Sequence, residues 1–400
     1  MLKNYTEISW LSEPALSFSS SKEALMHISR RNLLYGMGTG AIAGTALPSL
    51  AASYCSGLLP SADAGIGRPI RFDRNENPYG PPESAMAAVR ENLGRVNRYP
   101  DAWHELEAKI AAWHKVKAGL VVLGCGSSEI LRMAAGAFLH PGKKLVTAAP
   151  SFPLLAFYAR DNGAEVVEVP LTHEGAHDLK AMLARCDGST GLVHICNPNN
   201  PTGTLTPRAE IEEFLRKLPA NIPVVIDEAY HHYVDPAAPY ASFIDRPAEG
   251  NRTIVARTFS KIYALAGLRI GYAITSAELA EKLSASWLQF SVNALAIHAA
   301  SAALEDTEHV RRNAAANAQQ RREFVKQAKA RGMSAGESQT NFTLLQINRP
   351  IDGIMAHFRK SNLLVGPHFP GLDGFLRVSF GKPEEMVEFW RVWDTLPPKA

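Results

Sequence analysis

Short apolar runs alternate with helix-like segments along the chain from about residue 73 onward. Valine- and isoleucine-rich runs predict strands at Lys144–Ala148, Glu165–Leu171, Gly191–Cys196, Val224–Asp227, Thr253–Ala256 and Leu268–Ile274. Most of these runs are continuously apolar, which is typical of a sheet buried on both faces. Helices are predicted between them, for example over Ser128–Leu139 and over Pro207–Leu218, with Thr206 as the expected N-cap of the second. This alternation predicts an α/β domain with a mostly parallel central sheet.

The pattern changes after about residue 277. An alanine-rich helical stretch runs to about Arg331, and it is followed by two strand-like and two helix-like segments, Phe342–Ile347, Ile351–Lys360, Phe375–Ser379 and Glu384–Leu396. We therefore expect a large domain over residues 96–305 and a smaller C-terminal α/β domain over residues 306–400. Residues 53–95 are expected to form an N-terminal arm, with no regular element between Asp73 and Pro82.

The N-terminal segment has a composition of its own. Arg30 and Arg31 directly precede a run without charged residues, Asn32–Ala62, and small residues around Ser49–Ala52 suit a signal peptidase. This resembles a twin-arginine export signal. Residues 1–52 are therefore expected to be a signal peptide that directs the protein through the twin-arginine export machinery to the periplasm. A retained membrane anchor and a chance arginine pair are the alternatives.

Composition narrows the classes of function. The chain has 400 residues, of which 46% are hydrophobic and 20% charged, and its net charge is +3. This charge balance gives no support to a nucleic-acid-binding protein. The four cysteines show neither a paired metal-binding spacing nor a dense disulfide framework, so no metal site is expected.

A lysine follows one of the predicted buried strands. Lys261 ends the run Thr258-Phe259-Ser260-Lys261, and Arg269 lies eight residues later. A lysine that binds an aldehyde as a Schiff base must be largely shielded from water, and a phosphate needs hydroxyls and a guanidinium. The run fits a site for pyridoxal 5'-phosphate (PLP), although taken alone it is better explained by a surface lysine on a loop.

Two further polar groups end predicted strands upstream. Asp227 would keep a pyridine nitrogen protonated, and Tyr230 could hydrogen-bond the ring's 3-hydroxyl oxygen. The proline-rich turn Asn197–Gly203 would hold the Asn200 amide in a fixed direction, suited to donate to the same oxygen. A turn-capping aspartate and an ordinary loop are the alternatives.

Two remaining motifs could bind anions. The glycine turn before the helix at residue 128 carries Ser127 and Ser128, and backbone N–H groups at a helix N-terminus bind phosphate. Arg377 lies in the middle of a predicted strand, where a substrate carboxylate or a structural salt bridge would satisfy it.

Taken together, these motifs resemble the fold-type I, class I/II aminotransferases, and within them the histidinol-phosphate aminotransferase branch. The resemblance covers roughly residues 72–393. Its most similar stretches are Asn75–Gly80, Arg98–Asp101, Asn197–Gly203, Asp227–Tyr230 and Arg257–Tyr272.

The resemblance implies a homodimeric PLP enzyme that moves an amino group from an amino donor to a 2-oxo acid. Lys261 would carry the cofactor as a Schiff base and shuttle the substrate's α-proton, assisted by Asp227 and Tyr230. The implied cofactor site comprises Ser127, Ser128, Phe152, Asn200, Asp227, Tyr230, Thr258, Ser260, Lys261 and Arg269, with Tyr99 reaching the phosphate of the partner subunit. The implied substrate site comprises Tyr79, Asn200 and Arg377.

One position departs from the family. Histidinol-phosphate aminotransferases usually carry an arginine directly after the hydrophobic strand that precedes the Arg377 segment, and this chain has Gly366 there. We therefore expect a free amino acid with a neutral or aromatic side chain as the donor. A PLP-dependent decarboxylase or lyase remains the main alternative, and a non-catalytic PLP-binding protein is a third.

Overall fold

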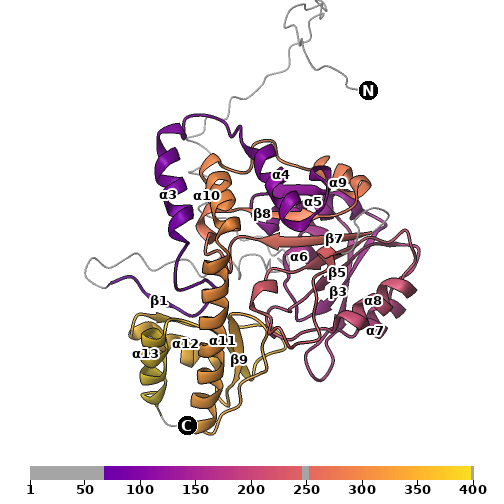
Figure 1. The fold of residues 1–400 in the computed structure, drawn as a ribbon. Coiled ribbons are helices and arrows are strands. Elements are labelled where there is room, and N and C mark those ends of the chain that lie inside the picture. The colour runs from indigo at the N-terminus through magenta and orange to yellow at the C-terminus, as the bar shows by residue number, and fades with distance from the viewer. Residues whose placement is uncertain (1–66, 246–251, 398–400) are drawn as a thin grey trace, which may run out of the picture. The chain divides into compact units, whose positions relative to one another are not determined.

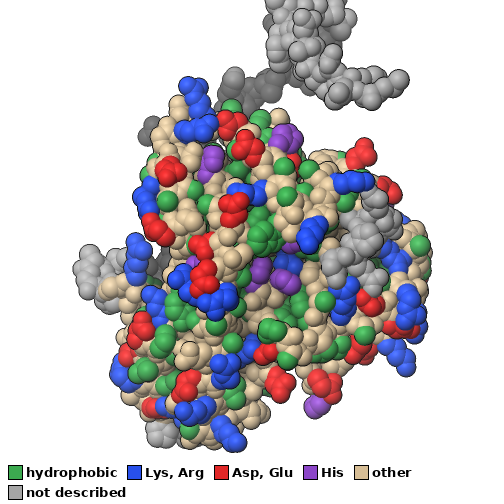
Figure 2. Space-filling model, viewed as in Figure 1, with side chains coloured by type: hydrophobic (Ala, Val, Ile, Leu, Met, Phe, Trp, Pro, Cys, Tyr) green, Lys and Arg blue, Asp and Glu red, His purple; other side chains and the backbone are tan. Residues whose placement is uncertain are grey.

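A computed structural model describes residues 67–245 and 252–397 (Figure 1). The predicted signal peptide, residues 1–52, lies outside the described residues, as does the beginning of the predicted arm. Within the two described ranges, no helix is long and apolar enough to cross a membrane. On the face shown in Figure 2, acidic and basic side chains are interspersed.

A seven-stranded sheet forms the centre of the described structure, in the order β2-β8-β7-β6-β5-β3-β4. The strands are β2 (Val121–Gly124), β3 (Lys144–Ala149), β4 (Glu165–Pro170), β5 (Thr190–Cys196), β6 (Val224–Asp227), β7 (Thr253–Thr258) and β8 (Gly271–Ile274). Within this sheet β8 runs antiparallel to both of its neighbours, and the other pairs are parallel. The predicted mostly parallel sheet is thus confirmed.

One predicted strand begins later than expected. The sequence pattern placed a strand over residues 268–274, but residues 266–268 form a 3₁₀ turn and β8 starts at Gly271. Arg269 has a left-handed backbone with φ of 57°, which an extended strand cannot accommodate. This turn directs the Arg269 side chain back toward the sheet edge, where it contacts Ser260.

Helices cover both faces of the sheet. They are α4 (Trp103–His114), α5 (Ser127–Phe138), α6 (Leu154–Asp161), α7 (Leu179–Ala184), α8 (Arg208–Lys217), α9 (Ala277–Ser284) and α10 (Ala294–Glu305). Two consecutive residues of β6 belong to different apolar clusters. Ile226 belongs to the cluster that includes residues of α4, α8 and α10, and Val225 belongs to the one that includes residues of α5, α6 and α9. Because successive side chains of a strand point to opposite faces, both faces of the sheet are buried.

The predicted cap of α8 is wrong. The helix begins at Arg208, and the N-cap position is Pro207, which has an extended backbone. The Thr206 hydroxyl instead contacts the backbone N–H and the ring Nδ1 of buried His177, at 3.2 Å each. Proline has no side-chain acceptor, so α8 begins without a side-chain cap.

The predicted alanine-rich helical stretch is three helices. After α9 and α10, a break at Asp306 precedes α11 (Thr307–Ala330), because the Asp306 carboxylate accepts a hydrogen bond from the His309 N–H at 2.9 Å. In Figure 1, α11 runs from the region of α10 to the C-terminal elements. These are β9 (Phe342–Gln346), α12 (Ile351–Lys360), β10 (Leu363–Leu364), β11 (Phe375–Ser379) and α13 (Pro383–Asp394).

The start of the described chain joins the C-terminal elements. Strand β1 (Ile70–Arg71) pairs in parallel with β10, and Phe72 is fully buried in the same apolar cluster as Phe358 and Phe389. Residues 73–82 then cross toward the central sheet without a helix or strand, and α3 (Glu83–Asn92) packs against α10. The arm segment therefore lies between the C-terminal elements and the carboxyl edge of the central sheet.

Candidate active site

The predicted functional side chains follow strands that end at one edge of the central sheet. Cys196 is paired in register with Asp227, and Asp227 with Ala256 on the next strand. At the end of β7, Thr258 is opposite Gly271, which also faces Gly124 at the end of β2. Since ligands of such sheets bind outside the carboxyl ends of parallel strands, this edge is the candidate site.

The predicted phosphate-binding groups come together at the N-terminus of α5. Ser127 and Ser128 begin the helix, and the hydroxyls of Thr258 and Ser260 are hydrogen-bonded at 3.0 Å. Arg269 Nη1 donates to Ser260 Oγ at 3.4 Å. Helix N–H groups, hydroxyls and a guanidinium thus surround one position, a chemical set that fits a phosphate dianion.

Two glycines make this close approach possible. Gly126 has a φ of +72°, and a Cβ there would lie 2.4 Å from Arg269 Nη2. A Cβ on Gly271 would lie 2.4 Å from the backbone nitrogen of Ser127. Any side chain at these two positions would therefore push the guanidinium or β8 away from the start of α5.

Lys261 is partly buried beside the arm. Its Nζ donates to the carbonyl oxygens of Asn75 at 3.1 Å and Arg74 at 3.3 Å, and it lies 5.6 Å from the centre of the Tyr230 ring. Burial lowers the pKa of Lys261 to about 8, and the nearby charge of Arg377 is the next cause. A neutral amine is therefore accessible near pH 8, which is what attack on an aldehyde requires.

Asp227 is a buried carboxyl group at the end of β6, with 2% of its surface exposed. Burial raises its pKa to about 6, while a 3.1 Å hydrogen bond from the Ala229 N–H lowers it. A buried carboxylate is stabilised by a cationic partner. A protonated pyridine nitrogen has the required charge, so this residue fits the predicted cofactor ring.

Tyr230 and Asn200 are both held by other side chains. The Tyr230 hydroxyl accepts a hydrogen bond from Asn75 Nδ2 at 3.0 Å, so its own proton remains available to donate. Asn200 Oδ1 accepts from Arg377 Nη1 at 2.7 Å, which leaves the amide nitrogen as its donor. Both side chains therefore keep a donor, and their contact with a ring oxygen stays a prediction.

Phe152 lies on the loop after β3 and is half-buried. The backbone N–H groups of Phe152 and Asn200 both contact the buried Cys196 thiol, whose pKa is raised well above its usual value, chiefly by burial. Because Cys196 neighbours Asp227 in the sheet, Phe152 is on the same edge as the predicted ring-binding residues.

Arg377 is 5% exposed and reaches the site from β11. Besides Asn200, its guanidinium donates to the Asp73 carbonyl oxygen at 2.7 Å, and it stacks 4.7 Å from the Phe369 ring centre. These contacts hold the guanidinium at the site, where its planar fork could bind an anionic ligand.

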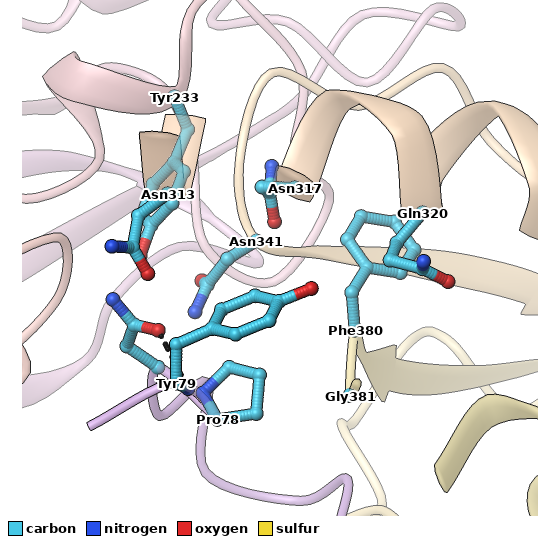
Figure 3. A pocket seen from close by; sticks show the side chains of 10 residues that line it. Pro78, Tyr79, Tyr233, Asn313, Asn317, Gln320, Asn341, Phe380 and Gly381 are labelled. Atoms are coloured by element: carbon cyan, nitrogen blue, oxygen red, sulfur yellow. Dashed lines mark hydrogen bonds between the residues drawn. The ribbon is translucent and has the colours of Figure 1, made fainter. Parts of the chain in front are cut away.

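Two predicted residues lie apart from this group. Tyr99 is 76% exposed, and its ring stacks on Phe290 with a centroid distance of 4.7 Å. Tyr79 is 38% exposed and lies on the arm, where it lines a small pocket described below (Figure 3).

Two residues that hold the site were given no role by the sequence. Asn75, with a left-handed φ of 54°, exchanges hydrogen bonds with Ser379 Oγ at 2.8 and 3.0 Å and also contacts Tyr230 and Lys261. Buried Glu129 accepts from the Cys125 N–H and from Ser291 Oγ, both at 2.6 Å, and so fixes the phosphate loop. Asn75 lay within a recognised motif, whereas no sequence pattern marked Glu129.

Residues 68–391 match the family model for aminotransferase class I and II. The chain belongs to this family. It is 39% identical to histidinol-phosphate aminotransferase 1 of Cupriavidus pinatubonensis over 82% of this chain and 87% of the relative. It is 35% identical to the histidinol-phosphate aminotransferase of Bacillus subtilis, over 82% of this chain and 91% of that protein.

A solved structure supports the same assignment. The histidinol-phosphate aminotransferase of Sinorhizobium meliloti, in complex with pyridoxal-5'-phosphate, superimposes with a TM-score of 0.75 at 25% identity. The match covers 86% of this chain and 95% of that one. The protein described here is accordingly an α/β, fold-type I, PLP-dependent aminotransferase similar to the histidinol-phosphate enzymes.

Proposed function

We propose that this protein transfers the amino group of a free amino acid to a 2-oxo acid, with PLP held by Lys261. One observation carries the assignment of the reacting group. Burial lowers the pKa of the Lys261 amine, and this residue lies on the loop that joins the hydroxyls of Thr258 and Ser260 to Arg269. When bound, PLP would supply the electron sink that stabilises negative charge at the substrate's α-carbon.

The chain's own residues have separable tasks in this proposal. The hydroxyls of Thr258 and Ser260, together with Arg269 and the start of α5, would bind the phosphate. Asp227 would hold the proton on the ring nitrogen. Asn200 and Tyr230 would donate to the ring oxygen, and Phe152 would pack on the ring face. Lys261 Nζ would take and return the proton of the substrate's α-carbon, since a pKa near neutrality suits a general base.

The substrate proposal rests on charge. Arg377 would bind the α-carboxylate bidentately, and the Phe369 ring covers one face of its guanidinium. Gly366 is buried against Met355, with a φ of +105°, and it brings no positive charge to the position where related enzymes carry an arginine. His368 is exposed and is paired with Asp373 at 2.6 Å. These features favour an amino acid whose only anionic group is its α-carboxylate, with a neutral or aromatic side chain, over a substrate with a phosphate dianion.

The test is kcat/KM for a panel of amino acids and for histidinol phosphate, with 2-oxoglutarate as the acceptor. Loss of one charge-assisted contact corresponds to about ten- to a hundredfold in affinity. We expect an amino acid to be preferred, and a strong preference for histidinol phosphate would refute the substrate proposal. Release of CO₂ or of an eliminated side chain without consumption of the 2-oxo acid would favour the decarboxylase or lyase alternative.

We further propose a homodimer in which Tyr99 binds the phosphate of the partner's cofactor. Exposed apolar side chains occur on two segments that meet where Tyr99 contacts Phe290, namely Leu93, Val96 and Tyr99 on one and Leu288 and Phe290 on the other. Such a patch favours a protein–protein contact. Mixing the inactive Lys261→Ala variant with a weakened Tyr99→Ala variant should create hybrids with one intact site. No gain in activity on mixing would refute the shared site.

Export is also proposed, on the basis of Arg30, Arg31 and the uncharged run that follows them. The twin-arginine pathway carries folded proteins, so the cofactor would be loaded before export. Replacing both arginines with lysine should retain the enzyme, with PLP bound, in the cytoplasm. Unchanged export of this double variant would refute the proposal.

A further inference from the structure

A small pocket lies beside the arm segment, and Lys261 is not among the residues that line it. Its walls come from the arm, from α11 and from the ends of β9 and β11 (Figure 3). The lining residues are Asn77, Pro78, Tyr79, Tyr233, Asn313, Asn317, Gln320, Asn341, Phe380 and Gly381. The cavity volume is about 10 Å³, enough for one water molecule or one small ion and too little for a substrate side chain.

Hydrogen bonds fix how the asparagine amides of this pocket are oriented. Asn313 Nδ2 donates to the His309 carbonyl oxygen at 2.9 Å, and Asn317 Nδ2 donates to the Thr340 carbonyl oxygen at 3.0 Å. Asn341 Nδ2 donates to the Asn75 carbonyl oxygen at 2.9 Å. Because each amide nitrogen is used in this way, each side-chain oxygen remains as a hydrogen-bond acceptor.

Two of these oxygens are buried and have no partner among the described residues, Asn313 Oδ1 and Asn341 Oδ1. The two residues are 7% and 2% exposed. In Figure 3 the oxygens of Asn313, Asn317 and Asn341 are directed into the space beside the Tyr79 ring. Buried acceptors of this kind are costly unless a donor or a cation satisfies them.

The electrostatic surroundings favour a cation. No lysine, arginine or histidine lines the pocket, and the Tyr79 ring offers an electron-rich face. The pKa of Tyr79 is raised by burial and then by the negative charges of Glu384 and Glu385 at the start of α13. These carboxylates place a negative potential at the pocket without lining it themselves.

We propose that this pocket is a binding site for a small monovalent cation. Uncharged carbonyl-type oxygens can replace the hydration shell of a potassium-like ion. Ca²⁺ and Mg²⁺ sites in proteins usually include at least one carboxylate, and the pocket lining has none. Alkali ions, ammonium and a primary alkylammonium share the required charge, and the size of the pocket favours the first two.

The site is connected to Lys261 through one backbone group. The Asn75 carbonyl oxygen accepts hydrogen bonds both from Asn341 Nδ2 and from Lys261 Nζ at 3.1 Å. Tyr79 and Asn77, on the same arm segment, line the pocket. A bound cation would therefore order the arm segment that Lys261 also contacts.

The PLP-loaded protein tests this proposal directly. Its melting temperature should rise and saturate with added KCl, RbCl or NH₄Cl, while choline chloride at the same ionic strength should have no effect. Methylammonium tests whether an amine can also occupy the site. Crystals soaked in RbCl should show an anomalous peak beside the Asn313 and Asn341 oxygens. The same melting temperature in every salt and no rubidium peak would mean that the pocket holds water, and would overturn the proposal.

Two substitutions at Asn313 and one control substitution at Asn92 separate cation binding from an effect on folding stability alone. Asn313→Leu removes one oxygen from the pocket, and the one side-chain hydrogen bond that it removes among the described residues is that to the His309 carbonyl within α11. It should raise the half-saturating KCl concentration at least about tenfold. Asn92→Leu is the matched control, because Asn92 Nδ2 makes the same contact to the Ala88 carbonyl on α3, away from the pocket. Asn313→Asp should tighten cation binding. A uniform loss of stability in Asn313→Asp, equal in KCl and choline chloride, would contradict the proposal.

Discussion

Replacing Gly126 with alanine should selectively damage phosphate binding. The new Cβ would lie 2.4 Å from Arg269 Nη2 and 3.0 Å from Arg269 Cζ, so the guanidinium must move away from the start of α5. The φ of +72° adds strain, because a residue with a Cβ rarely adopts this conformation. Stability and cofactor affinity should therefore both change, for different physical reasons.

The strain changes the free energy of folding, whereas the displaced guanidinium changes the free energy of PLP binding. Forcing a non-glycine residue into a left-handed backbone costs about 1–2 kcal/mol of folding free energy. Losing the charge-assisted contact between Arg269 and the phosphate costs about 1.5–3 kcal/mol of binding free energy, or roughly ten- to a hundredfold in the dissociation constant of PLP. The affinity loss is the diagnostic result, since strain alone would destabilise the fold without weakening the phosphate contact.

Gly142 provides the matched control. It has a φ of +85°, and a Cβ there would have no neighbour within 4 Å. Gly142→Ala should show a similar loss of stability in denaturant and an unchanged PLP dissociation constant, measured by fluorescence titration of the cofactor-free protein. If Gly126→Ala binds PLP within about threefold of the parent protein, the proposed contact between Arg269 and the phosphate is wrong.

Three further predictions concern the titrating groups. Lys261→Ala should abolish turnover yet retain some PLP through the phosphate contacts, with no borohydride-stable attachment; full activity would remove the central assignment. The rate of covalent PLP attachment should rise with pH and reach its inflection at about pH 8, the lowered pKa of Lys261. Arg377→Met removes a neighbouring positive charge and should move this inflection to higher pH. An unshifted profile would refute the electrostatic coupling between Arg377 and Lys261. The pKa of Asp227 is about 6 in the folded protein, against an ordinary value of 3.8. Between these pH values the native cofactor-free protein binds more protons than the unfolded chain, so its free energy of unfolding should fall by about 3 kcal/mol as pH rises. Denaturant unfolding from pH 4 to 7 should show this loss in the parent protein relative to Asp227→Asn, and parallel profiles would contradict it.

The sequence by itself determined the fold class and the chemistry of the site. Continuous valine- and isoleucine-rich runs identify strands buried on both faces, because only such a sheet needs apolar side chains at every position. The polar groups that end these runs, such as Asp227 and Lys261, are meaningful because the carboxyl ends of parallel strands meet at one edge. The order of these residues along the chain was therefore enough to predict a PLP site.

Local boundaries were less predictable. The pattern could not show that Arg269 adopts a left-handed backbone and delays β8, since its guanidinium packs against Gly126, more than 140 residues earlier in the chain. Likewise Thr206 is a good N-cap residue, but the tertiary structure places its hydroxyl beside His177. The intrinsic preference of a residue for a capping position does not decide its structure here, because a hydrogen bond to a buried polar partner contributes about as much free energy as a helix cap.

The contacts between distant segments were decided only by the tertiary structure. Asn75 connects Tyr230, Ser379 and Lys261, which are separated from it by 155 to 304 residues, and no local pattern encodes that meeting. Nor could the sequence show that Asn313 and Asn341 line one pocket, since α11 supplies Asn313 and the bend before β9 supplies Asn341. Composition and periodicity specify which side chains are buried, whereas the direction of a buried polar atom is fixed only when the partner elements pack around it.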